Sequence, residues 1–429
     1  MNNQKADIHC DLMIIGTGMA GMAAALFAAG QDLDIVQAGR TGQLGFASGL
    51  IDVLGIYPVA RSRIVKNPWP AIADLGRHEP AHPYAKMAIS EIQTAVDTVL
   101  GFFEQAGYPY MYRKNQNMIM PTAAGTVKPT YAAAHTMAHG QAAMAHQQPC
   151  LLVDFKGLKG FGSRMIAANL ARTWPGLRPV TIGFPEAGTE LHPEPMARAL
   201  ETARMREKLA ENIAPYLGDA ACVALPAILG ISRTQKVTKE LSGLLGVPVF
   251  EISTMVPGVS GIRIMEIFQQ HLPEMGINAF FQHNVRKACR KTGGGWVFEV
   301  GDRSHWRLVS ARAALVCSGR FLGGGLHADR AGITETIFNL PVARVPERDS
   351  WHHRDLLHAG GHPVNRAGLA VDTSFRPVDD NNSPVWPDLF AAGTILAGQD
   401  WMREKCGSGL SIATAYAAVR AARRFLEKT

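Results

Sequence analysis

Residues 11–40 constrain the fold of this chain more than any other stretch, because they read as a strand, a turn, a helix and a second strand within thirty residues. A short apolar run is followed directly by G-T-G-M-A-G and an alanine-rich segment. In that setting Gly16 allows a tight turn, Gly18 lets backbone amides approach a pyrophosphate, and Gly21 lets helix and strand pack closely. We therefore predict a βαβ unit that binds a dinucleotide or a flavin, with the anion at the start of the helix.

The end of the second strand departs from the usual pattern of such units. An acidic residue that would bond the adenosine ribose is expected there, but the strand runs into Gln37, Ala38, Gly39 and Arg40. Two interpretations stay open. Either Gln37 bonds a ribose hydroxyl and Arg40 meets a phosphate, or the ligand has no adenosine half.

The bulk properties indicate a globular protein of two or three domains. The chain has 429 residues, of which 47% are hydrophobic, and no charge-free apolar run is long enough to span a membrane. The first ten residues lack the basic start and apolar stretch of a signal peptide, so we expect a cytoplasmic location. The net charge of +7 is spread along the chain, a pattern that does not indicate a nucleic-acid-binding surface. A mildly basic surface suits a small anionic substrate or the edge of an acidic membrane, and ordinary solubility explains it equally well.

The cysteines do not form a metal-binding pattern. All six are scattered and none belongs to a C-x-x-C pair, so we expect neither a zinc site nor an iron–sulfur cluster on this chain. The nearest histidine-rich stretch, HHRDLLH at 352–358, lacks the i, i+4 spacing of helical metal ligands, and we interpret it as a polar surface segment. Any cluster that takes electrons from this protein would lie on a partner.

The organisation of the chain predicts an α/β fold: a Rossmann-like flavin-binding domain interrupted by a cap and by a second doubly wound α/β domain. Residues 1–55 form the first part of the flavin-binding domain, and residues 256–429 form the second part. The proline-rich stretch 56–148 reads as a cap or lid. Between 149 and 255, four apolar strands alternate with helices, including a long charged helix from Pro195 to Tyr216 that we interpret as a solvated face.

Three later segments supply further candidates for flavin binding. Small residues follow the second strand, an apolar strand ends in Ser318-Gly319, and a strand DLFAAG leads to Thr394 and then to a helix that opens with G-S-G. The start of that helix can point N–H groups at the electron-rich edge of a flavin ring. The predicted cofactor-binding residues are Gly16, Thr17, Gly18, Met19, Ala20, Gly21, Gln37, Ala38, Gly39, Arg40, Ala47, Ser48, Gly49, Ser318, Gly319, Gly393, Thr394, Gly407, Ser408 and Gly409.

These signals, in this order, resemble the glutathione-reductase-type flavoproteins in the broad sense. The motifs GFASGLIDVLG, EPAHPYAKM, MPTAAGTVKPTY, MVPGVSGIRI, SGRFLGGGL and CGSGLS narrow the resemblance. With them, residues 11–421 resemble the B subunit of the anaerobic glycerol-3-phosphate dehydrogenases. The general pattern prefers threonine where Ser318 stands and an acid where Thr394 stands.

The resemblance implies a flavoprotein that acts beside two partners, a flavin-containing A subunit with its own flavin site and a membrane-associated, iron–sulfur C subunit. Such a complex oxidises sn-glycerol 3-phosphate to dihydroxyacetone phosphate and passes electrons to quinone, and the chain would lie at the inner face of the membrane through its partners. The resemblance implies FMN, whereas the glycine motif favours FAD.

Substrate and proton-transfer residues are less clearly marked. A phosphate-bearing substrate needs cationic partners, and the candidates are Arg320, Lys128, Arg263 and Arg403, with Arg320 first because it follows Ser318-Gly319. Oxidation of an alcohol also needs a base. The histidines His82, His135, His139 and His146 are possible bases, but the sequence assigns no catalytic residue.

Two other functions remain open. In the first, the chain is a non-catalytic member of the complex: its flavin only relays electrons, or its fold only supports the A subunit. Alternatively, the chain is a succinate- or fumarate-type flavoprotein. That type would carry a histidine for covalent flavin attachment after the second strand, and GQLGFASG has none.

Overall fold

The computed structural model describes residues 6–186, 188, 190–302 and 304–429. Residues 1–5, the first half of the segment inspected for a targeting signal, lie outside this description. The chain divides into two compact units: unit 1 comprises Met1–Leu44, Asp52–Val99 and Phe268–Thr429, and unit 2 comprises Gly45–Ile51 and Leu100–Ile267. The stretch 56–148, expected to form a cap, is thus shared between the units, and the boundaries fall inside helices α3 (Ile89–Gln105) and α9 (Val259–Glu274).

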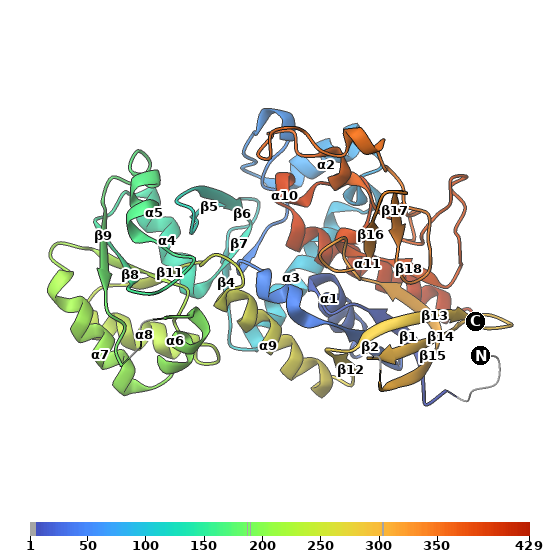
Figure 1. Cartoon of the computed structure of the whole chain (residues 1–429), viewed down its shortest axis with the longest axis horizontal. Coiled ribbons are helices and arrows are strands. Elements are labelled where there is room, and N and C mark those ends of the chain that lie inside the picture. Colours follow the sequence, from blue (N-terminus) through green and yellow to red (C-terminus); the bar gives the residue numbers. More distant parts are fainter. Residues whose placement is uncertain (1–5, 187, 189, 303) are drawn as a thin grey trace. The chain divides into compact units, whose positions relative to one another are not determined.

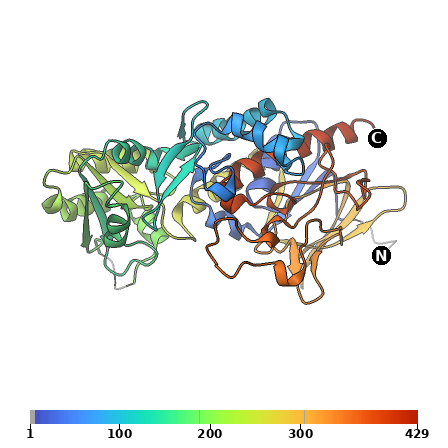
Figure 2. The same cartoon turned by 90° about the horizontal axis from the view of Figure 1, so that it is seen from above.

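Unit 1 is built on a seven-stranded sheet with the order β12-β2-β1-β15-β14-β13, in which β18 also pairs with β15. The pairs β1–β2, β2–β12, β1–β15 and β15–β18 are parallel, and β13, β14 and β15 are antiparallel. Blue strands from the start of the chain lie beside yellow and orange strands from its last third (Figures 1 and 2). The strands are β1 (Ile8–Ile15), β2 (Ile35–Gly39), β12 (Asn278–Phe281), β13 (Asn284–Arg290), β14 (Trp296–Gly301), β15 (Trp306–Val316) and β18 (Leu389–Ala391).

Two alanine-rich helices, α1 (Met19–Ala28) and α11 (Gly407–Leu426), pack on the parallel part of this sheet and on each other. Their small side chains allow close approach, and Phe27 meets Tyr416 edge to face at 5.2 Å. The remaining elements of unit 1 are α2 (Pro68–His78), the hairpin β16 (Leu326–Ala328) and β17 (Ile333–Glu335), and the short helix α10 (Trp401–Glu404). The predicted α/β domain, which is assembled from both ends of the chain and interrupted by its middle, is therefore confirmed.

Unit 2 contains a four-stranded, fully parallel sheet with the order β11-β10-β8-β9. Alternate residues of β8 face opposite sides: Leu151 and Val153 pack with α6, α7 and α8, while Cys150 and Leu152 pack with α4 and α5. Figure 1 shows these two sets of helices on either side of the green strands. The predicted second doubly wound domain is therefore correct.

The elements of unit 2 follow in chain order. They are β3 (Leu50–Ile51), β4 (Tyr110–Tyr112), β5 (Met118–Pro121), β6 (Val127–Thr130), β7 (Ala132–Ala134), α4 (His135–Ala145), β8 (Cys150–Phe155), α5 (Ser163–Leu170), β9 (Leu177–Ile182), α6 (Pro193–Ala199), α7 (Ala203–Ile213), β10 (Cys222–Pro226), α8 (Thr234–Leu245) and β11 (Val249–Ile252).

The prediction of one long charged helix from Pro195 to Tyr216 is wrong, because the structure has two helices there, α6 and α7. Leu200 is fully buried at the break, and the side chain of Arg206 is only 2% exposed. Arg206 donates to the Leu200 carbonyl oxygen at 2.7 Å and pairs with Glu240. One charged residue of the predicted solvated face is thus buried, and its guanidinium stabilises the turn between the helices.

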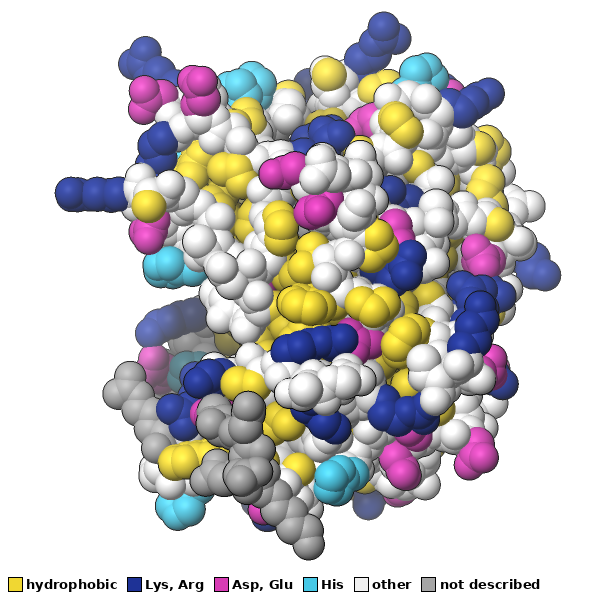
Figure 3. Space-filling view, turned by 90° about the vertical axis from the view of Figure 1, so that its right-hand side faces the viewer, with side chains coloured by type: hydrophobic (Ala, Val, Ile, Leu, Met, Phe, Trp, Pro, Cys, Tyr) yellow, Lys and Arg dark blue, Asp and Glu magenta, His cyan; other side chains and the backbone are white. Residues whose placement is uncertain are grey.

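Within the described residues, no helix is both long and apolar enough to cross a membrane. On one face of the structure, Lys and Arg side chains are scattered among acidic ones around a central group of apolar side chains (Figure 3).

Candidate functional site

The glycine turn between β1 and α1 is closed so tightly that side chains do not fit in it. Gly16 has a φ of +124°, and a Cβ there would lie 2.3 Å from the carbonyl oxygen of Cys317. A Cβ on Gly21 would lie 2.0 Å from the carbonyl oxygen of Gly16. Glycine is therefore required by packing at both positions, and at Gly16 by the backbone conformation as well.

The start of α1 is suited to an anion. Gly18 is the N-cap residue, no side chain caps this end, and the first turn holds no acidic residue. Thr17 is 1% exposed and its hydroxyl oxygen has no hydrogen-bond partner. Because buried polar atoms in proteins are nearly always paired, this hydroxyl and the uncapped helix end fit the pyrophosphate of a dinucleotide.

The end of β2 is tied to the glycine turn. Gln37 is fully buried, and its amide nitrogen donates to the carbonyl oxygen of Gly16 at 3.0 Å. Gln37 therefore supports the glycine turn from inside, but its buried Oε1 has no hydrogen-bond partner, and a contact with a ribose hydroxyl stays a prediction. A Cβ on Gly39 would lie 2.8 Å from the Thr17 nitrogen, so an acidic side chain does not fit there. Arg40 is exposed and stays a candidate for a phosphate contact.

A second loop follows β15 at the same edge of the sheet, because Ile15 at the end of β1 pairs in register with Val316. Cys317 donates its amide to the Ile15 carbonyl oxygen at 2.7 Å. The buried hydroxyl oxygen of Ser318 has no partner, and Gly319 has a φ of +68°. The glycine turn and this loop thus each carry a buried, unpaired hydroxyl group at the same edge of the sheet, which suits a polar ligand there.

Arg320, the next residue, is a buried cation with a vacant donor. Its side chain is 8% exposed, and Nη1 has no hydrogen-bond partner. Burial lowers the pKa of Arg320, and the nearby carboxylates Asp400 and Glu404 oppose that shift. A guanidinium group that is electrostatically supported and not saturated with hydrogen bonds is able to bind an oxygen anion.

The predicted flavin-binding segment around Gly393 and the start of α11 is only partly available to a ligand. Gly393 has a φ of +84°, and its amide donates to the Thr414 hydroxyl at 2.9 Å. The Gly409 amide donates to the Asp52 carbonyl oxygen at 2.7 Å. The expectation that Gly409 offers its N–H group to a flavin is therefore wrong. A Cβ on Gly409 would lie 2.7 Å from the Cα of Val53, so this glycine is explained by packing.

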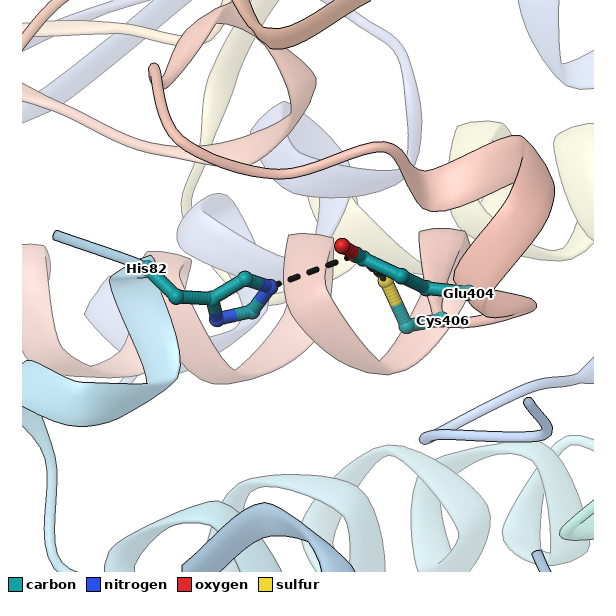
Figure 4. Close-up of side chains that lie close together, drawn as sticks. All are labelled: His82, Glu404 and Cys406. Atoms are coloured by element: carbon teal, nitrogen blue, oxygen red, sulfur yellow. Dashed lines mark hydrogen bonds and ion pairs between the residues drawn. The ribbon is translucent and has the colours of Figure 1, made fainter. Parts of the chain in front are cut away.

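Glu404, one of the two carboxylates near Arg320, belongs to a buried cluster with His82 and Cys406 (Figure 4). The side chains of His82 and Glu404 are 0% and 1% exposed, and His82 Nε2 lies 3.3 Å from Glu404 Oε2. The Cys406 thiol donates to the same oxygen at 3.4 Å. Burial raises the pKa of Glu404, but the hydrogen bond from His82, a backbone hydrogen bond at Asp400 and the charge of Arg366 outweigh it, so the net shift is downward.

The potential metal-ligand atoms of these three residues all lie within 4.8 Å of one another, which is close enough to hold a metal ion. The hydrogen bonds favour a different interpretation. His82 Nδ1 accepts from the Tyr84 amide at 3.1 Å, so the ring proton belongs on Nε2, which faces Glu404. An Nε2–H group is a donor and not a metal ligand, and the cluster is therefore explained as a hydrogen-bonded network around an ionised Glu404.

Four other predicted residues belong to unit 2. Ala47, Ser48 and Gly49 lie near Ser253 and Ser260: Ser253 donates its hydroxyl to the Ser48 carbonyl oxygen at 2.6 Å, and a Cβ on Gly49 would meet Ser260 Cβ at 2.7 Å. Lys128 lies in β6. Arg403, in contrast, belongs to α10 of unit 1 and is partly buried.

Arg263 is a correction among the phosphate candidates. It is fully buried in unit 2, where its two terminal nitrogens donate to both oxygens of Glu251 at 2.7 and 2.8 Å. Its third donor, Nε, bonds the Gly230 carbonyl oxygen at 2.8 Å. Because these bonds occupy the guanidinium group, Arg263 is a structural cation.

Of the histidines, His82 has both ring nitrogens engaged in the cluster described above. Burial lowers the pKa of His135 and of His139, which favours the neutral ring. Both ring nitrogens of His135 are buried without a hydrogen-bond partner. His146 is exposed. The HHRDLLH segment is an exposed loop in which the rings of His353 and His358 stack at 3.9 Å.

Sequence reasoning missed Glu404, Cys406 and Glu251. Glu251 had a signal, since a single acid inside the apolar strand PVFEIS implies a buried cationic partner. Glu404 and Cys406 had none, because their partner His82 is 322 residues away from Glu404 in the sequence.

Comparison with known proteins agrees with this geometry. A family model described as an FAD binding domain matches residues 11–410, and the chain belongs to that family. It is therefore a flavoprotein, and the FAD predicted from the glycine motif is confirmed. FMN, which only the resemblance implied, gains no support from this match.

Relatives similar over their whole length carry dehydrogenase names. A protein of Halobacterium salinarum, named as the probable B subunit of an anaerobic glycerol-3-phosphate dehydrogenase, is 32% identical over 97% of this chain and 98% of the relative. A Vibrio vulnificus protein, named as the B subunit of the same kind of enzyme, is 27% identical over 97% and 96%. With the family, these names support a flavin-dependent dehydrogenase.

Solved structures match at low similarity. The 3-ketosteroid-Δ4-(5α)-dehydrogenase of Rhodococcus jostii aligns with a TM-score of 0.42 and 11% identity, covering 99% of this chain and 98% of that one. A flavocytochrome c3 fumarate reductase aligns with a TM-score of 0.42 and 11% identity, covering 99% and 79%.

Proposed function

We propose that this chain is the B subunit of an anaerobic sn-glycerol-3-phosphate dehydrogenase that oxidises glycerol 3-phosphate to dihydroxyacetone phosphate. Two electrons and a proton leave C2 of the substrate as hydride, and the hydroxyl proton leaves to a base. Bound FAD supplies the hydride acceptor. The names of the relatives support the substrate, and the buried, unsaturated guanidinium of Arg320 is the observation on which the proposal rests.

In this proposal the glycine turn and the Ser318-Gly319 loop hold the cofactor. Gly16, Thr17, Gly18 and the first amides of α1 bind the pyrophosphate, and Ser318 donates its unpaired hydroxyl to the ligand. Arg40 remains the candidate for a second phosphate contact. Gly407, in the same unit, stays a candidate for close approach to the cofactor, while Ala47, Ser48 and Gly49 in unit 2 remain candidates from the sequence pattern alone.

Arg320 binds the anionic end of the substrate. A charge-assisted hydrogen bond from a buried guanidinium orients the phosphate and excludes uncharged alcohols. Glu404, kept ionised by His82, and Asp400 balance the charge of Arg320 while the site is empty. Arg403, in the same unit as Arg320, remains a secondary candidate for a phosphate contact, and Lys128 in unit 2 remains a candidate from the sequence alone.

Electrons then pass to partner subunits, which we propose to be a flavin-containing A subunit with its own flavin site and a membrane-associated, iron–sulfur C subunit, and from them to quinone. The relatives' designation as a B subunit supports the existence of partners. Through these partners the chain would lie at the cytoplasmic face of the membrane.

The Arg320→Ala variant tests this assignment. Because a hydrogen bond to a charged group contributes about 1.5–3 kcal/mol, we expect the glycerol 3-phosphate concentration for half-maximal flavin reduction to rise roughly 10- to 100-fold. The measurement is anaerobic stopped-flow reduction of the flavin in the purified chain. Arg320→Lys should recover part of the loss, and reduction by dithionite should be unchanged. An unaltered concentration dependence in Arg320→Ala removes Arg320 from the substrate site.

A further inference from the structure

A short hairpin in unit 1, residues 55–65, presents a rigid tip to solvent. The Tyr57 amide donates to the Arg63 carbonyl oxygen at 2.9 Å, and the Val65 amide donates to the Gly55 carbonyl oxygen at 2.9 Å. Tyr57 and Val65 are buried, at 8% and 6% exposure, and Ser62 at the tip has a φ of 46°. The tip is thus fixed by backbone hydrogen bonds and by two buried anchors.

The tip and the residues that follow it carry unbalanced positive charge. Arg61, Arg63 and Lys66 are exposed, and in the part of the chain that the structure describes none of them forms a hydrogen bond or ion pair through its side chain. Residues 53–73 contain no acidic residue. The first acid after them, Asp74, pairs with Arg77 at 3.1 Å and with His78 at 3.5 Å, so its charge is balanced within its own helix.

An apolar side chain projects among these cations. Ile64 is 45% exposed, although its neighbour Val65 is buried. A groove of about 460 Å³ runs beside it, and its lining includes Arg63, Lys66, Pro70, Ala71 and Asp74, whose carboxylate is paired with Arg77. An exposed apolar side chain that is flanked by unpaired cations matches the boundary between lipid headgroups and acyl chains.

We propose that this basic loop, residues 59–67, docks on an anionic phospholipid surface. Its three cations interact with lipid phosphates, Ile64 enters the headgroup boundary, and the groove accommodates a headgroup. The loop would give the chain a membrane contact of its own, additional to any contact through partner subunits. An acidic protein segment is disfavoured because the tip offers a protein partner little apolar area beyond Ile64.

The experiment is flotation of the purified, FAD-containing full chain with vesicles of phosphatidylcholine alone or with about 30% phosphatidylglycerol. We expect binding only to the anionic vesicles, and less binding at 300 mM than at 50 mM KCl because salt screens surface charge. The triple variant Arg61→Gln/Arg63→Gln/Lys66→Gln should bind on the order of a hundred-fold more weakly, at roughly five-fold per basic residue. Ile64→Ser should weaken binding a few-fold with little change in the salt dependence.

A matched variant separates this loop from net charge. Lys156→Gln/Arg164→Gln/Arg172→Gln removes the same charge from three exposed cations elsewhere and should bind like the wild type. Equal losses in both triple variants, or no binding of the wild type to anionic vesicles, overturn the proposal. Competition by millimolar inorganic phosphate would identify a free-phosphate site and would also overturn it. Flavin content and thermal midpoint show whether each variant is folded.

Discussion

Replacing Gly21 by valine is expected to yield a folded chain that retains less than about a tenth of the wild-type FAD. The reason is geometric: even the Cβ of the new residue would lie 2.0 Å from the Gly16 carbonyl oxygen and 2.7 Å from the Gly16 carbonyl carbon. The helix must move away from the turn, and the amides that face the pyrophosphate then lose their arrangement. Flavin absorbance per chain after desalting is the measurement.

A matched control comes from Gly101 in α3, where an added Cβ meets no atom within 4 Å. Gly101→Ala should keep full flavin content, and it is expected to be slightly stabilising because alanine favours helix more than glycine does. If Gly21→Val retains flavin at wild-type stoichiometry, the glycine turn is not the cofactor site.

The buried ion pair of unit 2 predicts the second large effect. Glu251 and Arg263 are 1% and 0% exposed and form two hydrogen bonds to each other. Removal of one partner of such a pair costs about 3–5 kcal/mol because the other charge is left uncompensated. Glu251→Gln should therefore destabilise unit 2 by that amount. Urea unfolding, together with hydrogen exchange in β11, which carries Glu251, measures the loss.

The double variant Glu251→Leu/Arg263→Met is the control for this pair. Because it removes both charges and restores apolar packing, it should be far more stable than Glu251→Gln. If the single and double variants are equally destabilised, packing and not charge explains the effect.

The same pair sets a pH dependence. Burial alone would raise the pKa of Glu251, but the charge and hydrogen bonds of Arg263 lower it below 4.5. A carboxyl group whose folded-state pKa is depressed stabilises the fold above the unfolded-state pKa and loses that contribution as pH falls through the folded-state value. The stability of wild-type unit 2 should therefore fall below pH 4.5, and Glu251→Gln should lack this part of the decrease.

The sequence was sufficient for the parts of the fold that local patterns encode. The glycine turn lies between a buried strand and a helix within residues 11–40, and the parallel strands of unit 2 alternate with helices at regular spacing, so both follow from short-range rules. The break between α6 and α7 was missed because the charged pattern of 195–216 continues through it. Only the packing of Arg206 onto the Leu200 carbonyl oxygen reveals it.

The site could be predicted where glycines allow backbone segments to pack closely. It could not be predicted where a polar or charged side chain pairs with a residue that is distant in the sequence. Gly16 and Gly21 are explained by contacts to neighbouring backbone atoms. Gln37, Arg263 and the cluster around Glu404 depend on partners that the sequence does not place: Gln37 bonds the turn itself, and Arg263 bonds an acid in β11. Whether a polar residue faces a ligand or the protein interior is decided by tertiary packing, which residue type and spacing do not specify.

The most direct test is an anaerobic titration of the purified, FAD-containing chain with sn-glycerol 3-phosphate, followed by flavin absorbance, with the released cofactor identified by mass. We predict that FAD is released and that the flavin bleaches on addition of substrate when no partner protein is present. A flavin that dithionite reduces but that stays oxidised with glycerol 3-phosphate until a partner protein is added would contradict the account and would make this chain an electron relay.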